Sequence, residues 1–104
     1  MRVDDQHNPL AIEIRQEMAS AYFASCRKML DSLNALKAFD ESLAPSTPDA
    51  EQLTRRSELL HDAAERVIFV LIQREAMKLP WYDEFFEDYG ISPEVRARLG
   101  TRRH

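Results

Sequence analysis

The chain has 104 residues, of which 44% are hydrophobic and 31% charged, and its net charge is −4. This length and composition predict one globular domain with a single core, and exclude a disordered tail. Two glycines are too few for the turns of a sheet protein, and the acidic balance gives no general attraction to nucleic acid or anionic lipid.

Three further features predict a cytoplasmic protein. The single cysteine excludes an internal disulfide and fits a reducing compartment. Residues 1–7 are polar, lack the apolar core of a signal peptide, and are expected to form a flexible N-terminus. The longest apolar run, Val67 to Ile72, is too short to span a bilayer.

The first predicted helix covers residues 8–43 and organises the chain. Asn8 is a capping residue and Pro9 fits the first turn, where its missing N–H costs nothing. No glycine or proline follows, so the helix forms a rod roughly 50 Å long. Its main apolar stripe has helical spacing and consists of Leu10, Ile14, Met18, Tyr22, Cys26, Met29, Leu33, Leu36, Phe39 and Leu43.

A second apolar stripe lies beside the first and contains Ile12, Ala19, Phe23 and Leu30. Together the two stripes cover more than half of the helix circumference, which is wider than a helix with one neighbour needs. We therefore expect this helix to contact at least two partners.

Pro45 and Pro48 end the first helix, and a second is predicted over residues 48–78 with Thr47 as its cap. Its main apolar stripe consists of Leu53, Leu60, Ala64, Val67 and Leu71. Because Phe69 and Ile72 continue the opposite, charged face with apolar groups, the segment from Val67 to Ile72 is expected to be buried on every side.

Residues 81–99 are predicted to form two short helices, followed by a tail over residues 100–104. Pro80 stops the second helix, and Gly90 is the natural C-terminal cap of the third. Trp81 and Phe85 are expected to anchor the short helices over the apolar end of the second helix. Pro93 then begins a fourth helix after the cap Ser92.

The predicted fold class is all-α: a long antiparallel helical hairpin with two short C-terminal helices. Because these short helices cannot also cover the first helix, we expect two hairpins to form a homodimeric four-helix bundle. A monomer with a bent first helix is the alternative. The predicted interface residues are Ile12, Phe23, Leu30, Phe69, Ile72, Trp81 and Phe85.

Four segments carry a resemblance to known proteins: Ala35 to Asp40, Ala63 to Val67, Arg74 to Met77 and Tyr89 to Gly100. With them the chain resembles a family of small, all-helical bacterial proteins classed as a domain of unknown function. The resemblance covers most of the chain from the first helix onward. It implies a bacterial source and a helical fold, and it supplies no activity or catalytic residues.

The candidate for metal binding is Glu58-x-x-His61, a spacing that places a carboxylate and an imidazole on one helical face as in di-iron bundles. Glu65 lies one turn further along. A di-iron site needs this motif on two helices, and the first helix has no histidine. A solvated charged face is therefore the preferred interpretation, and we predict no cofactor and no metal.

The short helices offer two other candidate surfaces. The preferred interpretation of the aromatic residues is that they cap the core: Trp81, Tyr82, Phe85, Phe86 and Tyr89. If they line a groove instead, the acidic residues that alternate with them favour a basic or amphipathic helix as its guest. Four arginines make the C-terminus basic but lack an interleaved aromatic platform, so they give little support for nucleic-acid binding: Arg96, Arg98, Arg102 and Arg103.

Together these patterns predict a protein-interaction module that self-associates, has no catalytic activity and can hold a further protein partner. The alternatives are a helical bundle that holds a ligand or a metal, and a small nucleic-acid-binding regulator that uses the basic C-terminus.

Overall fold

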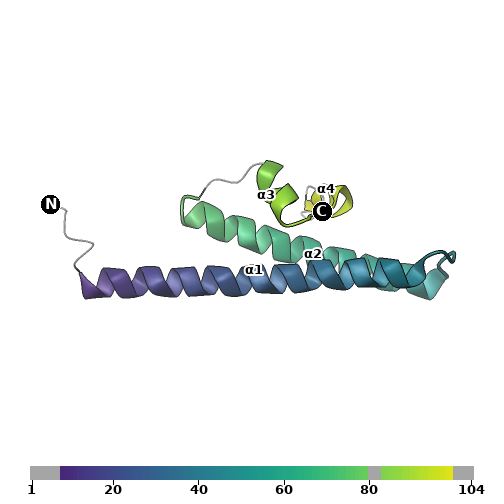
Figure 1. Cartoon of the computed structure of the whole chain (residues 1–104), viewed down its shortest axis with the longest axis horizontal. Coiled ribbons are helices and arrows are strands. Elements are labelled where there is room, and N and C mark those ends of the chain that lie inside the picture. The colour runs from purple at the N-terminus through teal and green to yellow at the C-terminus, as the bar shows by residue number, and fades with distance from the viewer. Residues whose placement is uncertain (1–7, 80–82, 100–104) are drawn as a thin grey trace.

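A computed structural model describes residues 8–79 and 83–99, and all regular structure in those ranges is helical (Figure 1). The helices are α1 (Pro9–Leu43), α2 (Ala50–Ala76), α3 (Asp83–Asp88) and α4 (Pro93–Leu99). The molecule measures 63 × 24 × 22 Å, and its radius of gyration is 17.7 Å. A compact domain of this size has a radius of gyration of about 13 Å. The elongation follows from the long α1.

Side-chain caps fix where the long helices begin. The Asn8 side chain accepts hydrogen bonds from the backbone N–H groups of Leu10 and Ala11, at 2.9 and 3.4 Å, as the sequence predicts. The predicted cap of α2 is wrong, because Asp49 rather than Thr47 caps it. Asp49 accepts from the N–H of Gln52 at 2.8 Å, while the Gln52 side chain accepts from the N–H of Asp49 at 2.9 Å. This reciprocal capping box starts the helix at Ala50.

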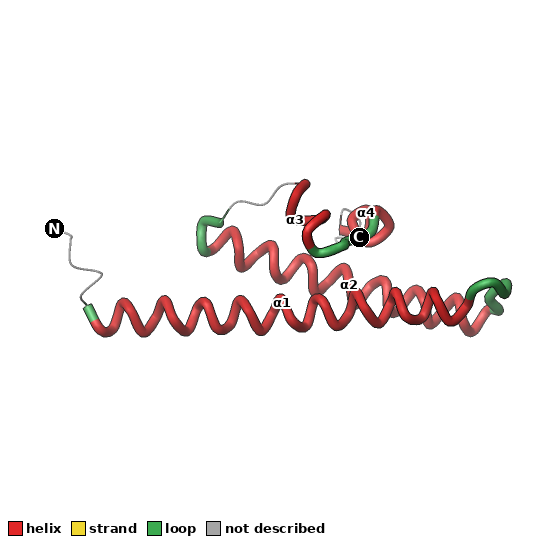
Figure 2. The backbone as a smooth tube through the Cα atoms, in the orientation of Figure 1, coloured by secondary structure: helices red, strands yellow, loops and turns green. Residues whose placement is uncertain are grey.

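The antiparallel register of α1 and α2 leaves the N-terminal end of α1 without a neighbouring helix in residues 8–79 and 83–99. Side-chain hydrogen bonds join the two helices at three residue pairs of the described chain: Arg74 to Tyr22, Ser32 to Asp62, and Arg56 to Asp40. Since Arg74 lies almost at the end of α2, the turns of α1 before Tyr22 extend past it. Figure 2 shows this free N-terminal segment of α1.

One core lies between α1, α2 and the two short helices. Met29, Val67, Val70 and Val95 are fully buried in it. The expectation that the segment from Val67 to Ile72 is buried on every side is wrong for a single chain. Phe69 and Ile72 remain 52% and 54% exposed, because neither α1 nor the α3–α4 pair covers them.

Left-handed residues end α2 and α3 in the same way. Gly90 has φ of 65°, and the N–H groups of Gly90 and Ile91 donate to the carbonyls of Glu87 and Phe86. This Schellman motif confirms the predicted role of Gly90. Lys78 has φ of 60° and occupies the corresponding position after α2, where a side chain costs free energy that glycine avoids.

Candidate interaction surfaces

The first candidate surface is the N-terminal overhang of α1, defined as Pro9 to Met18. Leu10, Ile14 and Met18 are 63%, 49% and 41% exposed. They belong to the same stripe as Tyr22, which is buried one turn later and accepts a hydrogen bond from Arg74 of α2. The apolar stripe therefore continues for about three turns beyond the helix that it packs against.

The second stripe of α1 is also uncovered. Ile12, Phe23 and Leu30 are 38%, 63% and 37% exposed, so the later helices of the same chain do not shelter them. The centre of the Phe23 ring lies 5.8 Å from the centre of the ring of Tyr22, a core residue.

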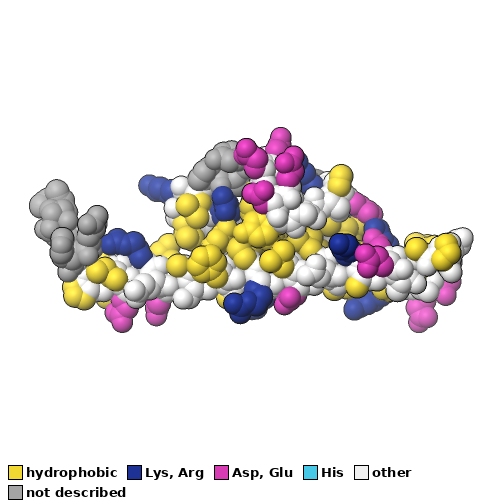
Figure 3. Space-filling view, in the orientation of Figure 1, with side chains coloured by type: hydrophobic (Ala, Val, Ile, Leu, Met, Phe, Trp, Pro, Cys, Tyr) yellow, Lys and Arg dark blue, Asp and Glu magenta, His cyan; other side chains and the backbone are white. Residues whose placement is uncertain are grey.

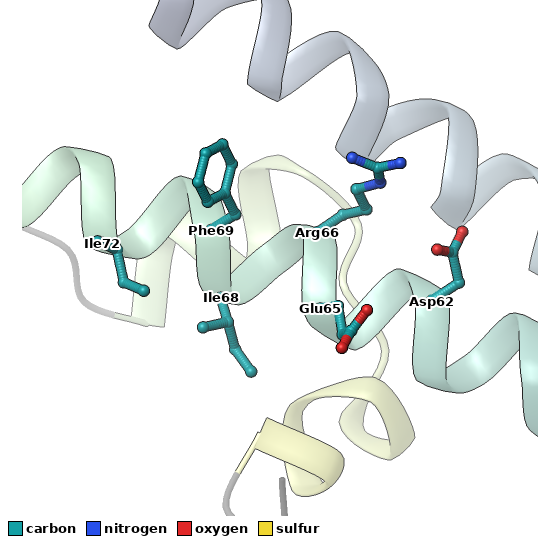
Figure 4. A pocket seen from close by; sticks show the side chains of 6 residues that line it. All are labelled: Asp62, Glu65, Arg66, Ile68, Phe69 and Ile72. Atoms are coloured by element: carbon teal, nitrogen blue, oxygen red, sulfur yellow. The ribbon is translucent and has the colours of Figure 1, made fainter.

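A third apolar surface lies on α2, where a hollow has a volume of about 380 Å³. The side chains that line it all come from α2 and are labelled in Figure 4: Asp62, Glu65, Arg66, Ile68, Phe69 and Ile72. Since one helix supplies the entire lining, the hollow is open surface rather than an enclosed site. Phe69 and Ile72 are both more than half exposed there, and the carboxylates of Asp62 and Glu65 lie at one end.

The opposite half of the hairpin is held by an ion-pair network centred on Arg56. Its guanidinium group contacts Asp40 of α1 at 2.7 and 3.0 Å, and Glu94 of α4 at 2.7 Å through both terminal nitrogens. These hydrogen bonds lower the pKa of both carboxyl groups and raise the pKa of Arg56. Arg56 therefore joins three helices at one point.

The sequence contains one sign of this network, the position of Arg56, but helical spacing does not identify the residues that Arg56 binds. Arg56 lies on the buried stripe of α2, four residues before Leu60, and a cation on a buried face requires a partner. Its partners, Asp40 and Glu94, are too distant in the sequence to be identified from a helical pattern.

A smaller polar cluster lies inside the other half of the molecule. The Arg74 guanidinium donates to the Tyr22 hydroxyl at 2.7 Å and lies 5.2 Å from the centre of the Phe85 ring. The Tyr89 hydroxyl lies 3.8 Å from Cys26 Sγ, and burial is the main cause that raises the pKa of Tyr89. Cys26 is a buried free thiol, as its position in the apolar stripe predicts.

The candidate metal residues form a loose surface cluster. His61 Nε2 lies 3.3 Å from Glu65 Oε2, and both side chains are more than half exposed. Glu58 instead pairs with Arg55 at 3.3 Å. Among residues 8–79 and 83–99, no group of three or more His, Cys, Asp or Glu side chains is arranged to hold a metal ion.

Some aromatic and basic candidate residues of the C-terminal segment have structural roles, and others lie outside the described residues. Phe85 is buried in the core of its own chain, whereas Trp81 lies outside the described residues. Arg96 pairs with Asp83 at 2.5 Å and lies 4.0 Å from the centre of the Phe86 ring, so it has a structural role. Arg102 and Arg103 lie outside the described residues.

No family model, curated protein or solved structure matches this chain. The resemblance to a bacterial helical family stays a prediction. Within the described parts of the chain, no helix combines the length and apolar character needed to cross a bilayer.

Proposed function

We propose that the chain is a non-catalytic protein-interaction module that pairs with a second copy through its uncovered apolar surfaces. The observation that carries the proposal is the exposure of large apolar side chains along one half of the hairpin, which monomeric proteins avoid. These side chains are Leu10, Ile12, Ile14, Met18, Phe23, Leu30, Phe69 and Ile72. The single buried cysteine supports a cytoplasmic location.

The free energies of burial and of association limit which dimer is possible. Burying the exposed part of one such side chain stabilises a complex by roughly 1 kcal/mol, or on the order of 15 kcal/mol for eight from each copy. Association itself costs about 4 to 15 kcal/mol. A stable pair must therefore bury most of this surface, as the proposed four-helix bundle would, and a contact through the overhang alone is too small.

Sedimentation equilibrium of serine variants tests the proposal with a matched control. Ile72 and Leu53 are both 54% exposed and both lie on α2, but Leu53 is near the interhelical loop, away from the proposed interface. We expect Phe69→Ser with Ile72→Ser to weaken self-association at least about tenfold, the equivalent of 1.4 kcal/mol. Leu53→Ser should leave it unchanged. Equal effects of the two changes would contradict the proposed interface.

A further inference from the structure

A groove separate from the proposed dimer surface lies between the C-terminal half of α1 and the α3–α4 turn. Its volume is about 740 Å³, within the range of protein binding sites. Unlike the hollow on α2, it has walls from different helices. Its floor is apolar: the partly buried side chains of Leu33 and Tyr89 line it and pack against the core, over the buried Leu36 and Val95.

The rim of the groove carries negative charge on both walls. Glu41 lines it from α1, while Glu87 and Asp88 line it from α3. Figure 3 shows acidic side chains gathered over α3. Within the described part of the chain, none of these three carboxylates has an ion pair, whereas Lys37 is the one lysine in the lining.

Three further charged residues of the groove form a network. Asp40, Arg56 and Glu94 also line it, and their mutual hydrogen bonds fix them in the wall. Because two carboxylates share one guanidinium group, the network keeps a net negative charge and adds to the negative potential of the rim. It also joins α1 to α4, so the opposite walls of the groove are held at a set separation.

We infer that this groove binds a basic amphipathic helical segment of another protein. The apolar face of the guest would lie on the floor, and its lysines or arginines would reach Glu41, Glu87 and Asp88. Helices bind apolar grooves in this way, and complementary charge on the rim fixes their orientation and raises the association rate. This inference is independent of the proposed self-association.

Fluorescence anisotropy with a designed probe tests the inference. The probe is a labelled peptide of about 18 residues, or five helical turns, in which leucines repeat at helical spacing and lysines fill the other face. A second peptide has the same composition in an order without an apolar face. We expect only the first peptide to bind. Equal binding of both peptides would overturn the inference, because it would show charge attraction without use of the groove.

Charge variants locate the binding site. Glu41→Lys with Glu87→Lys and Asp88→Lys should weaken peptide binding at least about tenfold, because three attractive contacts become repulsive. The matched control reverses two exposed carboxylates of the α1 overhang, Glu13→Lys with Glu17→Lys, and should change the affinity less than about twofold. Similar losses in both variants would overturn the inference.

A variant that gains affinity for the peptide distinguishes an effect on the groove from a loss of folding, because misfolding would not strengthen binding. Lys37→Glu removes the lysine that would repel the probe, so we expect it to strengthen peptide binding about threefold in low salt. A loss of affinity in this variant, with helical content unchanged by circular dichroism, would contradict the assigned groove.

Discussion

Both ends of the α1–α2 hairpin carry apolar stripes at helical spacing, but the two ends differ in how far other helices cover these stripes. Near the interhelical loop, α4 covers α2, and Arg56 bonds to Asp40 and Glu94 so that three helices are joined. At the other end, the α1 stripe continues through Ile14 without a neighbour, and Phe69 is half exposed on α2. Helical periodicity therefore identifies surface that must be buried, but the helices of the described residues cover that surface at only one end.

The largest effect should distinguish two positions on the same stripe of α1. Met29 is fully buried, so Met29→Ala should lower the free energy of unfolding by about 3 kcal/mol through lost burial and a cavity. Ile14→Ala, on the overhang, should change it by less than about 0.5 kcal/mol in dilute protein. Urea unfolding followed by circular dichroism measures both values. Equal losses would mean that the overhang packs within its own chain.

The stability of the hairpin end near the interhelical loop should depend on Arg56. Arg56→Met removes its hydrogen bonds to two carboxylates, and we expect the free energy of unfolding at pH 7 to fall by about 1.5 kcal/mol. The expected loss is modest because Asp40 and Glu94 are 39% and 51% exposed, and solvent screens their charges. Arg55→Met is the control, since its ion pair is exposed; a comparable loss there would contradict a special role for Arg56.

Acid should remove the contribution of the network. The folded pKa values of Asp40 and Glu94 are lowered, so their stabilising contribution is complete above the unfolded values of about 4. It is lost as the pH falls through the lower folded values. The difference in unfolding free energy between wild type and Arg56→Met should therefore narrow from pH 7 to pH 2. A constant difference would show that Arg56 acts through packing alone.

The smallest expected effects are at Lys78 and Gly90, the left-handed residues that follow α2 and α3. Lys78 has φ of 60°, so Lys78→Gly should raise the free energy of unfolding by about 0.5 to 1 kcal/mol. Gly90→Ala should lower it by a similar amount, because Gly90 has φ of 65°. Thermal unfolding measures both changes. A destabilised Lys78→Gly variant would contradict the assigned role of the left-handed residue.

Local patterns predicted the helical fold because its signals are close in the sequence. Asn8 and Gly90 fulfil the roles expected of a cap and a helix stop. The cap of α2 was misassigned, because Thr47 and Asp49 are both good capping residues and only the backbone shows which one begins the helix.

The candidate sites were less predictable because they depend on contacts between distant residues. Nothing in helical spacing indicates that Glu41 and Glu87 line one groove, or that Phe85 becomes buried while Phe69 does not. The width of the apolar surface on α1 could be recognised from the sequence. Which part of that surface its own chain covers follows only from the register of the hairpin.

The most direct test of the proposed self-association is the mass of the wild-type chain in solution. Light scattering after size-exclusion chromatography, at protein concentrations from low to high micromolar, should give twice the 12.1 kDa mass of one chain at the upper end. A single species of 12.1 kDa throughout that range would contradict the proposal that the exposed surfaces of α1 and α2 pair two copies.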